Sequence, residues 1–324
     1  MVTFRRPRAP SPRRNGPAVL PNPLAAGLGI VADAMMGEPP ASVHPVRMFG
    51  TSMQCVEHVL YRDTRGAGAV HALAGTALGL GAGASLSSTA VATYVAVAGR
   101  ALRTTALEVR DSLASSDLEG ARALLPSLVG RDPNGLDSEE IARAVVESVA
   151  ENTVDAVVAP AVWAAAAGAP GALGYRALNT LDSMVGHRSP RYERFGWGSA
   201  RLDDAAAYLP ARLTAVLVAA VRPRAAVDVW RAVHLQAPLH PSPNAGVAEA
   251  AFAAALGVRL GGTNRYGDET EHRPALGRGR PPEVSDIARA VQLSDAVTAA
   301  LVALLTGVGL VSAMVEWRKR RRTP

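Results

Sequence analysis

The sequence predicts an all-α protein, a polytopic integral membrane helical bundle with further helices and loops in the cytoplasm or at the membrane interface. Hydrophobic residues make up 48% of the 324 residues although aromatic residues contribute only 4%, which is a high apolar content for a soluble chain. Several apolar segments approach or exceed the roughly 20 residues that a membrane-spanning helix requires. The basic residues, nearly all arginine, gather at both ends and in loops, as they do beside membrane spans.

Residues 1–16 differ in character from the rest of the chain. They are rich in proline and arginine and lack hydrophobic periodicity, so we expect a disordered basic tail. Residues 17–324 are expected to form a single membrane domain. Its mostly apolar start, residues 17–36, also permits interpretation as a signal peptide, although Asp33 interrupts the small-residue end that cleavage would need.

Four apolar segments are candidates for membrane spans, and span counting suggests roughly four to six crossings. Residues 67–99 contain no Asp, Glu, Lys or Arg and predict one long tilted helix or a tight hairpin, with a buried helix pair in a soluble core as the alternative. Residues 296–315 are uncharged and precede Trp317 and an arginine cluster. Residues 153–174 and 205–221 are apolar but carry polar groups.

The positive-inside rule places both arginine-rich termini in the cytoplasm, which implies an even number of crossings of the cell membrane. Residues 100–140 and 222–290 are charged and interrupted by Gly and Pro, so we expect them in the cytoplasm or at the interface. Within them, residues 267–282 predict a mobile loop.

Composition and motifs exclude several classes of function. The net charge of +6 is modest, and the arginines do not alternate with aromatics along one face, so no nucleic-acid partner is expected. Lys319 is the only lysine, which excludes a P-loop nucleotide site. Cys55 is the only cysteine, so an internal disulfide and a thiolate metal cluster are excluded and a buried apolar thiol is expected.

A helix should begin near Ser138, because Asp137 and Glu140 form the Asp-x-x-Glu pattern of a capping box. Four charged residues then recur every four positions and share one face of that helix: Arg143, Glu147, Glu151 and Asp155. A solvated amphipathic helix with an ion pair between the first two explains this stripe simply.

The stripe also continues without a break into the apolar segment at 153–174. A lone ionised Asp at membrane depth costs about 2.5–3.5 kcal/mol. We therefore expect Asp155 to face protein or water, and the acidic stripe to line a pocket.

Further polar clusters follow in the next segments. Asn179 and Asp182 are one helical turn apart and can share a ligand. Asp203 and Asp204 are adjacent and suit a magnesium ion held together with substrate phosphate, with helix capping as the alternative. Pro210 predicts a kink that frees backbone groups near this cluster.

Residues 242–246, with Asn244 at their centre, predict a turn that starts a helix. Its free amides would suit an anion, and ordinary helix capping is the alternative.

Taken together, these segments resemble the adenosylcobinamide-phosphate synthase (CobD/CbiB) family of cobalamin biosynthesis over residues 20–315. The order and spacing of the matching stretches make a chance likeness improbable. These stretches are 37–40 with 44–47, 130–132, 147–155, 175–186, 200–204, 210–214 and 242–246. The sequence departs from the family pattern at Glu38 (usually Asp), Pro133 (usually Thr) and Ala207 (usually Asn).

The resemblance implies an enzyme that joins adenosylcobyric acid to (R)-1-aminopropan-2-ol phosphate or ethanolamine phosphate through an amide bond, giving adenosylcobinamide phosphate. It implies ATP and Mg²⁺ as cofactors and a corrinoid as substrate. Activation of a carboxylate as an acyl phosphate requires metal ligands, phosphate-binding arginines and a base for the amine.

The candidates for these roles fall into four groups. The candidate bases, which the sequence does not rank, are Glu147, Glu151 and Asp155. The candidate metal ligands are Asp203 and Asp204, with Asp182 as a third. The phosphate-binding candidates are Arg131, Arg201 and Arg212. The other substrate-binding candidates are His44, Arg47, Asp132, Asn152, Asn179 and Asn244.

Two alternatives remain open: a membrane sensor or signalling protein on the same fold, and a corrinoid transporter, which would also place acidic residues at membrane depth. The lipid bilayer is an expected partner in every case. A homo-oligomer is left open.

Overall fold

The computed structural model describes residues 22–40, 44–130, 132–187, 189–266 and 269–322. The tail expected at residues 1–16 therefore lies outside the described residues. The α-helices are α1 (Asn22–Met36), α2 (Pro45–Leu60), α3 (Arg65–Ser85), α4 (Thr89–Ala96), α5 (Gly99–Ala114), α6 (Leu118–Leu124), α7 (Ser138–Thr153), α8 (Ala159–Leu181), α9 (Trp197–Val221), α10 (Ala226–Leu235), α11 (Ala245–Leu256) and α12 (Val284–Arg322). Short 3-10 turns are η2 (Leu125–Ser127), η5 (Pro223–Ala225) and η6 (Ala237–Leu239), π-helical turns are η3 (Val154–Val158) and η4 (Asp182–Gly186), and β1 (Leu260–Tyr266) pairs with β2 (Glu269–Leu276).

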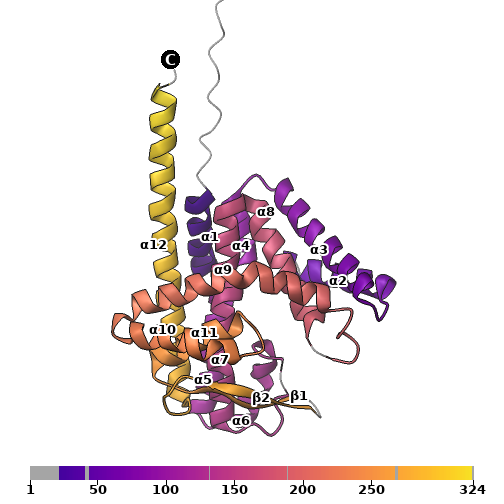
Figure 1. The fold of residues 1–324 in the computed structure, drawn as a ribbon, viewed down its shortest axis with the longest axis vertical. Coiled ribbons are helices and arrows are strands. Elements are labelled where there is room, and N and C mark those ends of the chain that lie inside the picture. The colour runs from indigo at the N-terminus through magenta and orange to yellow at the C-terminus, as the bar shows by residue number, and fades with distance from the viewer. Residues whose placement is uncertain (1–21, 41–43, 131, 188, 267–268, 323–324) are drawn as a thin grey trace, which may run out of the picture.

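The helices form two layers along the long axis of the molecule (Figure 1). One layer contains α1, α3, α4, α8 and the C-terminal part of α12, and the other contains α5, α6, α7, α10, α11 and the β1–β2 hairpin. Helix α9 runs crosswise to α12 where the layers meet. We call the second layer the polar layer, because it carries most of the charged helices and loops.

The expected helical membrane bundle is confirmed. Among the described residues, four helical stretches are long and apolar enough to cross a membrane: Arg65–Ser85, Ser138–Gly186, Trp197–Val221 and Val284–Lys319. Each of the four predicted apolar segments overlaps one of them. Because α9 lies crosswise to α12 (Figure 1), these two helices cannot both follow the membrane normal.

Helices α1 and α12 pack antiparallel. Gly309 lies against Leu24 near the start of α1, Gly27 lies against Thr306, and Asp33 near the end of α1 shares a cavity with Asp295. The beginning of α1 and the end of α12 therefore lie at the same end of the molecule, opposite the polar layer (Figure 1). Ala26 and Ile30 of α1 belong to the hydrophobic core, so the described part of the segment that permits a signal-peptide interpretation, residues 22–36, is packed as a core helix.

Helices α3 and α8 approach each other through glycines on α3. A Cβ atom added to Gly79 would lie 2.5 Å from the Cβ of Ala177, and one added to Gly83 would lie 2.5 Å from the carbonyl oxygen of Ala169. Small residues allow such close contact between helices in a membrane, where packing replaces the hydrophobic effect. The segment at 67–99 thus contains two helices, α3 and α4, and the first packs against α8 through its glycines.

Two predictions are wrong. Residues 267–282 were expected to form a mobile loop, but β2 occupies Glu269–Leu276 and pairs with β1 from Tyr266 to Leu260. Its last residue, Leu276, is fully buried, so the hairpin is anchored in the core. Cys55 was expected to be buried, but it is exposed on α2, because Met53 and Glu57 are the residues that this helix buries.

Candidate active site

Helix α7 begins as the capping box predicts. Glu140 N donates to Asp137 Oδ1 at 2.8 Å, and Asp137 N donates to Glu140 Oε2 at 3.0 Å. The helix starts at Ser138 and continues through η3 into α8. The acidic stripe therefore extends, as predicted, from the polar layer into an apolar helix.

The π-helical turn η3 has a cause in the sequence. Pro160 has no N–H, so the carbonyl four residues earlier, that of Ala156, loses its helical partner. Ala98 N, at the start of α5, donates to this oxygen at 2.9 Å. The proline thus allows α5 to join the helix directly beside Asp155, and π-helical turns of this kind often occur at functional sites.

Five carboxylates meet around this turn, and we call them the acidic cluster. Asp155 interacts electrostatically with Glu151 and Asp182, and Asp182 interacts with Asp204. Asp203 interacts with Asp155 and Asp182. The members of the acidic cluster are Glu151, Asp155, Asp182, Asp203 and Asp204, contributed by α7, η3, η4 and α9.

Neighbouring side chains hold the acidic cluster in place. Tyr175 Oη donates to Asp155 Oδ1 at 3.3 Å, and the Asn179 side chain forms a hydrogen bond with Asp203. Asp203 is only 8% exposed, and within the described chain its Oδ1 has no hydrogen-bond partner. Burying an unsatisfied polar atom costs free energy, so this oxygen is suited to a ligand.

Helix α9 carries Asp203 and Asp204 and continues through Pro210. The proline frees the carbonyl of Ala206, four residues earlier. The indole Nε1 of Trp163 on α8 donates to this oxygen at 3.0 Å. The predicted release of a backbone group is therefore present, and it fixes α9 against α8.

A polar pocket lies at the other end of the stripe. It has a volume of about 110 Å³ and is lined by Leu128, Val129, Gly130, Glu147, Ser148, Glu151, Glu249 and Arg273. Glu151 belongs both to this pocket and to the acidic cluster. The stripe therefore connects two polar sites.

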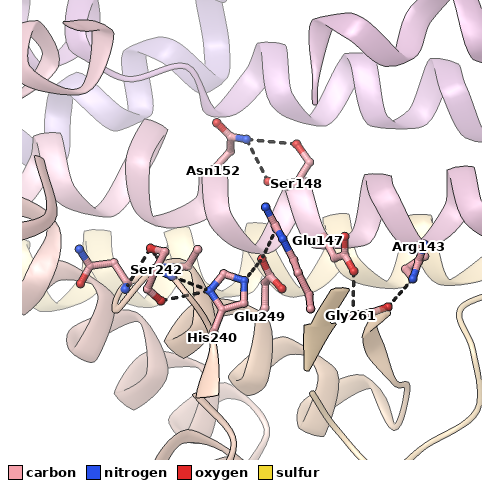
Figure 2. Close-up of polar contacts among 11 residues, drawn as sticks. Arg143, Glu147, Ser148, Asn152, His240, Ser242, Glu249 and Gly261 are labelled. Atoms are coloured by element: carbon pink, nitrogen blue, oxygen red, sulfur yellow. Dashed lines mark hydrogen bonds and ion pairs between the residues drawn. The ribbon is translucent and has the colours of Figure 1, made fainter. Parts of the chain in front are cut away.

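Figure 2 shows how the polar pocket is assembled. Glu147 is 2% exposed, and its Oε1 accepts from Gly261 N at 2.8 Å. Arg143 donates to the carbonyl oxygen of Gly261 (Figure 2) and to that of Thr263. The first two members of the stripe therefore bind the start of β1, which explains why the hairpin packs on α7.

Sequence reasoning missed Glu249 and His240. Glu249 on α11 is fully buried, and His240 Nε2 lies 3.7 Å from Glu249 Oε1 (Figure 2). Arg273 Nη1 lies 4.0 Å from the same oxygen. The available signal was one Glu within the otherwise apolar sequence of α11, because Glu is almost never fully buried unless paired.

Two of the substrate-binding candidates, Asn244 and Arg212, contact each other. Asn244 does not cap α11 with its side chain; it donates to the Asp204 carbonyl at 2.8 Å and accepts from Arg212 at 2.8 Å. The Arg212 guanidinium lies 3.5 Å from the Tyr208 ring centroid. Both residues thus join α9 to α11 next to the acidic cluster.

Other candidates make local contacts or are exposed. His44 caps α2 by accepting from Val46 N at 3.3 Å, and Arg47 is exposed on α2. Asp132 accepts two hydrogen bonds from Asn134 at 2.9 Å, which is a local turn. Arg131 lies outside the described residues.

Three further positions of interest lie on α7 and α9. Asn152 donates to Ser148 on α7 at 3.0 and 3.1 Å (Figure 2). Arg201 is exposed and interacts electrostatically with Asp204. Ala207, where the family pattern has Asn, is buried at 1% exposure, so it leaves no polar group there.

The described residues contain no group of three His, Cys, Asp or Glu side chains that could hold a metal ion by themselves. Asp203, Asp204 and the third candidate, Asp182, therefore do not form a complete protein cage. Magnesium, however, is usually bound by one or two carboxylates together with substrate phosphates and water. The partnerless Oδ1 of Asp203 fits that kind of site.

Comparisons with known proteins agree on one family. The family model described as CobD/Cbib protein matches residues 26–294. A cobalamin biosynthesis protein CobD from Mycobacterium tuberculosis (strain ATCC 25618 / H37Rv) is 49% identical over 309 residues, covering 90% of this chain and 95% of that protein. The CobD protein of Chromobacterium violaceum is 42% identical over 284 residues, covering 82% and 90%. No solved structure is significantly similar to the chain.

Proposed function

Because the chain belongs to the CobD/CbiB family, we propose that it forms the amide bond between adenosylcobyric acid and an amino-alcohol phosphate. The second substrate is (R)-1-aminopropan-2-ol phosphate or ethanolamine phosphate, and the product is adenosylcobinamide phosphate. The observation that supports this proposal most is the stripe of Glu147, Glu151 and Asp155, which links a polar pocket to an acidic cluster with an unsatisfied buried oxygen.

The chemistry requires two steps. A carboxylate does not react with an ammonium group, so the corrin carboxylate must first take the terminal phosphoryl group of ATP to give an acyl phosphate and ADP. The amine then attacks the acyl carbon, gives up a proton to a base, and phosphate leaves. The chain must therefore supply groups that hold phosphates and a carboxylate that accepts a proton.

The acidic cluster contains candidates for both tasks. Asp203 and Asp182 would hold Mg²⁺ together with phosphate oxygens, and the ion would neutralise phosphate charge. Asp155 is the base that we favour, since it lies within the acidic cluster and Tyr175 orients its carboxylate. Glu147 already accepts from a backbone amide, which suits a positioning role.

The test is direct synthesis by the purified full-length protein in detergent. Adenosylcobyric acid, amino-alcohol phosphate, ATP and magnesium should give adenosylcobinamide phosphate, identified by mass spectrometry, and omission of ATP should abolish the product. A protein that makes no product but accumulates labelled corrinoid in vesicles would instead support transport. A protein that does neither but binds corrinoid would support the sensor alternative.

A further inference from the structure

A second cavity lies outside the proposed active site. It has a volume of about 90 Å³ and opens between α1, α5 and α12, with Val149 of α7 and Val157 of η3 on its inner wall. No member of the acidic cluster lines it. We call it the outer cavity.

Asp33 of α1 lies in the wall of the outer cavity and is 3% exposed. Its Oδ2 accepts from Arg100 N at 3.0 Å, but within the described residues its Oδ1 has no hydrogen-bond partner. A buried carboxylate oxygen without a partner is costly unless a donor or a cation meets it. The structure therefore calls for a positively charged or donating group at this oxygen.

The two threonine hydroxyl groups at or near the outer cavity are already used. Thr298 Oγ1 donates to the Ser294 carbonyl at 2.8 Å, and Thr153 Oγ1 donates to Ser294 Oγ at 2.7 Å. The hydrogens of both threonines thus have acceptors other than Asp33. A ligand is better placed than these side chains to satisfy the carboxylate.

The mouth of the outer cavity has the opposite charge. Arg100 and Arg103 stand one turn apart on α5 and are exposed. Arg103 Nη1 pairs with Asp295 at 2.9 Å, with side chains 55% and 45% exposed, and exposed pairs are weak enough for an anion to displace. Arg100 Nη1 donates to the Met35 carbonyl at 2.7 Å, which fixes its guanidinium at the mouth.

We propose that the outer cavity binds a small zwitterion that carries an ammonium group and a phosphate on a short carbon chain. The ammonium would meet Asp33 inside, and the phosphate would meet Arg100 and Arg103 at the mouth. A ligand with only a negative charge would be repelled by Asp33, and a ligand with only a positive charge would be repelled by Arg100 and Arg103. The volume of about 90 Å³ is small, so it suits an aminoalkyl arm and excludes a corrin.

Two sources share this chemistry. One is the head group of phosphatidylethanolamine, whose acyl chains could follow the exposed apolar side chains Val31 of α1 and Leu304 and Val308 of α12. The other is free amino-alcohol phosphate, and this source rests on the proposed function. Binding is measurable without corrinoid or ATP, so it can be tested independently of synthesis.

The experiment uses the delipidated full-length protein in detergent. Calorimetric titration with O-phosphoethanolamine should show binding, and inorganic phosphate and ethylamine should each bind at least roughly tenfold more weakly. Native mass spectrometry from nanodiscs should show retained phosphatidylethanolamine but not phosphatidylcholine if the source is lipid. Displacement of that lipid by free O-phosphoethanolamine would place both in one site.

The variants are Asp33→Asn and Arg103→Gln, with Arg110→Gln, further along α5 and paired with Asp111, as the control. Each test variant should weaken binding by roughly tenfold or more, and the control should not. Arg103 is exposed, so its variant remains informative if Asp33→Asn does not fold. Equal binding by Arg103→Gln and the native protein, or no binding of either zwitterion, would overturn the inference. If the native protein binds the zwitterion but makes no adenosylcobinamide phosphate, only the proposed function is contradicted.

Discussion

At the residue scale, Asp203 and Asp204 are adjacent in sequence but differ in environment. Asp203 is 8% exposed and faces Asp155 and Asp182, whereas Asp204 is half-buried and interacts with Arg201. Successive residues on a helix point in directions about 100° apart, so the pair cannot serve a ligand equally. The buried member is the better candidate for metal and phosphate.

We therefore expect Asp203→Asn to reduce amide formation by roughly 100-fold or more, because it removes ligand charge while keeping the shape of the side chain. Added magnesium should partly restore the rate. Thermal stability should barely change. The measurement is the initial rate of product formation across a magnesium titration in detergent.

Two further variants make this prediction specific. Asp155→Asn should lose activity to a similar degree without rescue by magnesium, because a base is not replaced by metal. Asp228→Asn, at an exposed side chain on α10, should keep the native rate. A native rate for Asp203→Asn at limiting magnesium would remove Asp203 from the site.

At the scale of elements, two prolines connect helices by freeing carbonyl groups. Pro160 frees the Ala156 oxygen for the start of α5, and Pro210 frees the Ala206 oxygen for Trp163. In an apolar surrounding every backbone group must find a partner. These contacts therefore help to fix α5 against η3 and α9 against α8.

The contact of Trp163 is testable. Trp163→Phe keeps most of the ring but removes the indole donor, so it should lower the free energy of unfolding by about 1 kcal/mol. Trp230→Phe, on α10, is the control because Trp230 is similarly exposed, at 40% compared with 37% for Trp163. Thermal unfolding in detergent should separate the two variants, and equal melting temperatures would show that the Ala206 carbonyl is satisfied in another way.

The contact between α3 and α8 gives a second test at this scale. Gly83→Ala should destabilise the protein by roughly 1–3 kcal/mol, because the new methyl group would lie 2.5 Å from backbone atoms of Ala169 and Pro170. Gly81→Ala is a matched control two residues away, where nothing lies within 4 Å. Destabilisation by both variants alike would point to the loss of glycine itself, and not to the close contact.

Local rules explain which elements were predictable. The start of α7 follows from the capping pair Asp137 and Glu140. The free carbonyl group of Ala206 follows from Pro210, which has no N–H to donate to it. Both effects operate within four residues. The β1–β2 hairpin was missed because Gly261 is held by Glu147 and Arg143, more than 100 residues earlier in the chain. Glu249 was missed for the same reason, since its partners His240 and Arg273 come from different elements.

At the scale of the whole molecule, α12 sets the relation between the termini and the site. It contains 39 residues and is about 58 Å long at 1.5 Å per residue, roughly twice the 30 Å hydrocarbon thickness of a bilayer. Its first turns lie in the polar layer, where Asp286 pairs with Arg280 and Arg289. Its last turns carry Trp317 and the terminal arginines.

With this arrangement, two expectations from the sequence conflict: cytoplasmic termini and a cytoplasmic polar layer. The arginine clusters favour cytoplasmic termini, while the charged regions at 100–140 and 222–290 were also expected in the cytoplasm or at its interface. If α12 crosses the bilayer, the start of α1 and the end of α12 face the opposite side from the polar layer (Figure 1). The proposed use of ATP favours the cytoplasm for the polar layer.

We therefore expect tags at residue 1 and after Pro324 to report the same side of the membrane, and Cys55 to report the other. Cys55 is the only cysteine, is exposed, and lies on α2. A Cβ atom added to Gly50 of the same helix would lie 3.9 Å from Met184 Sδ of η4. A membrane-impermeant maleimide should label Cys55 in inverted vesicles but not in intact cells. In a Cys55→Ser background, Asp228→Cys on α10 should behave in the same way, because it lies in the polar layer. Cys55→Ser alone should remain unlabelled.

Labelling of both cysteines in intact cells would place the polar layer outside the cell. That result would support the cytoplasmic termini that the arginine clusters predict, and it would count against the use of cytoplasmic ATP. If the tag after Pro324 reports the same side of the membrane as the cysteines, α12 does not cross the bilayer.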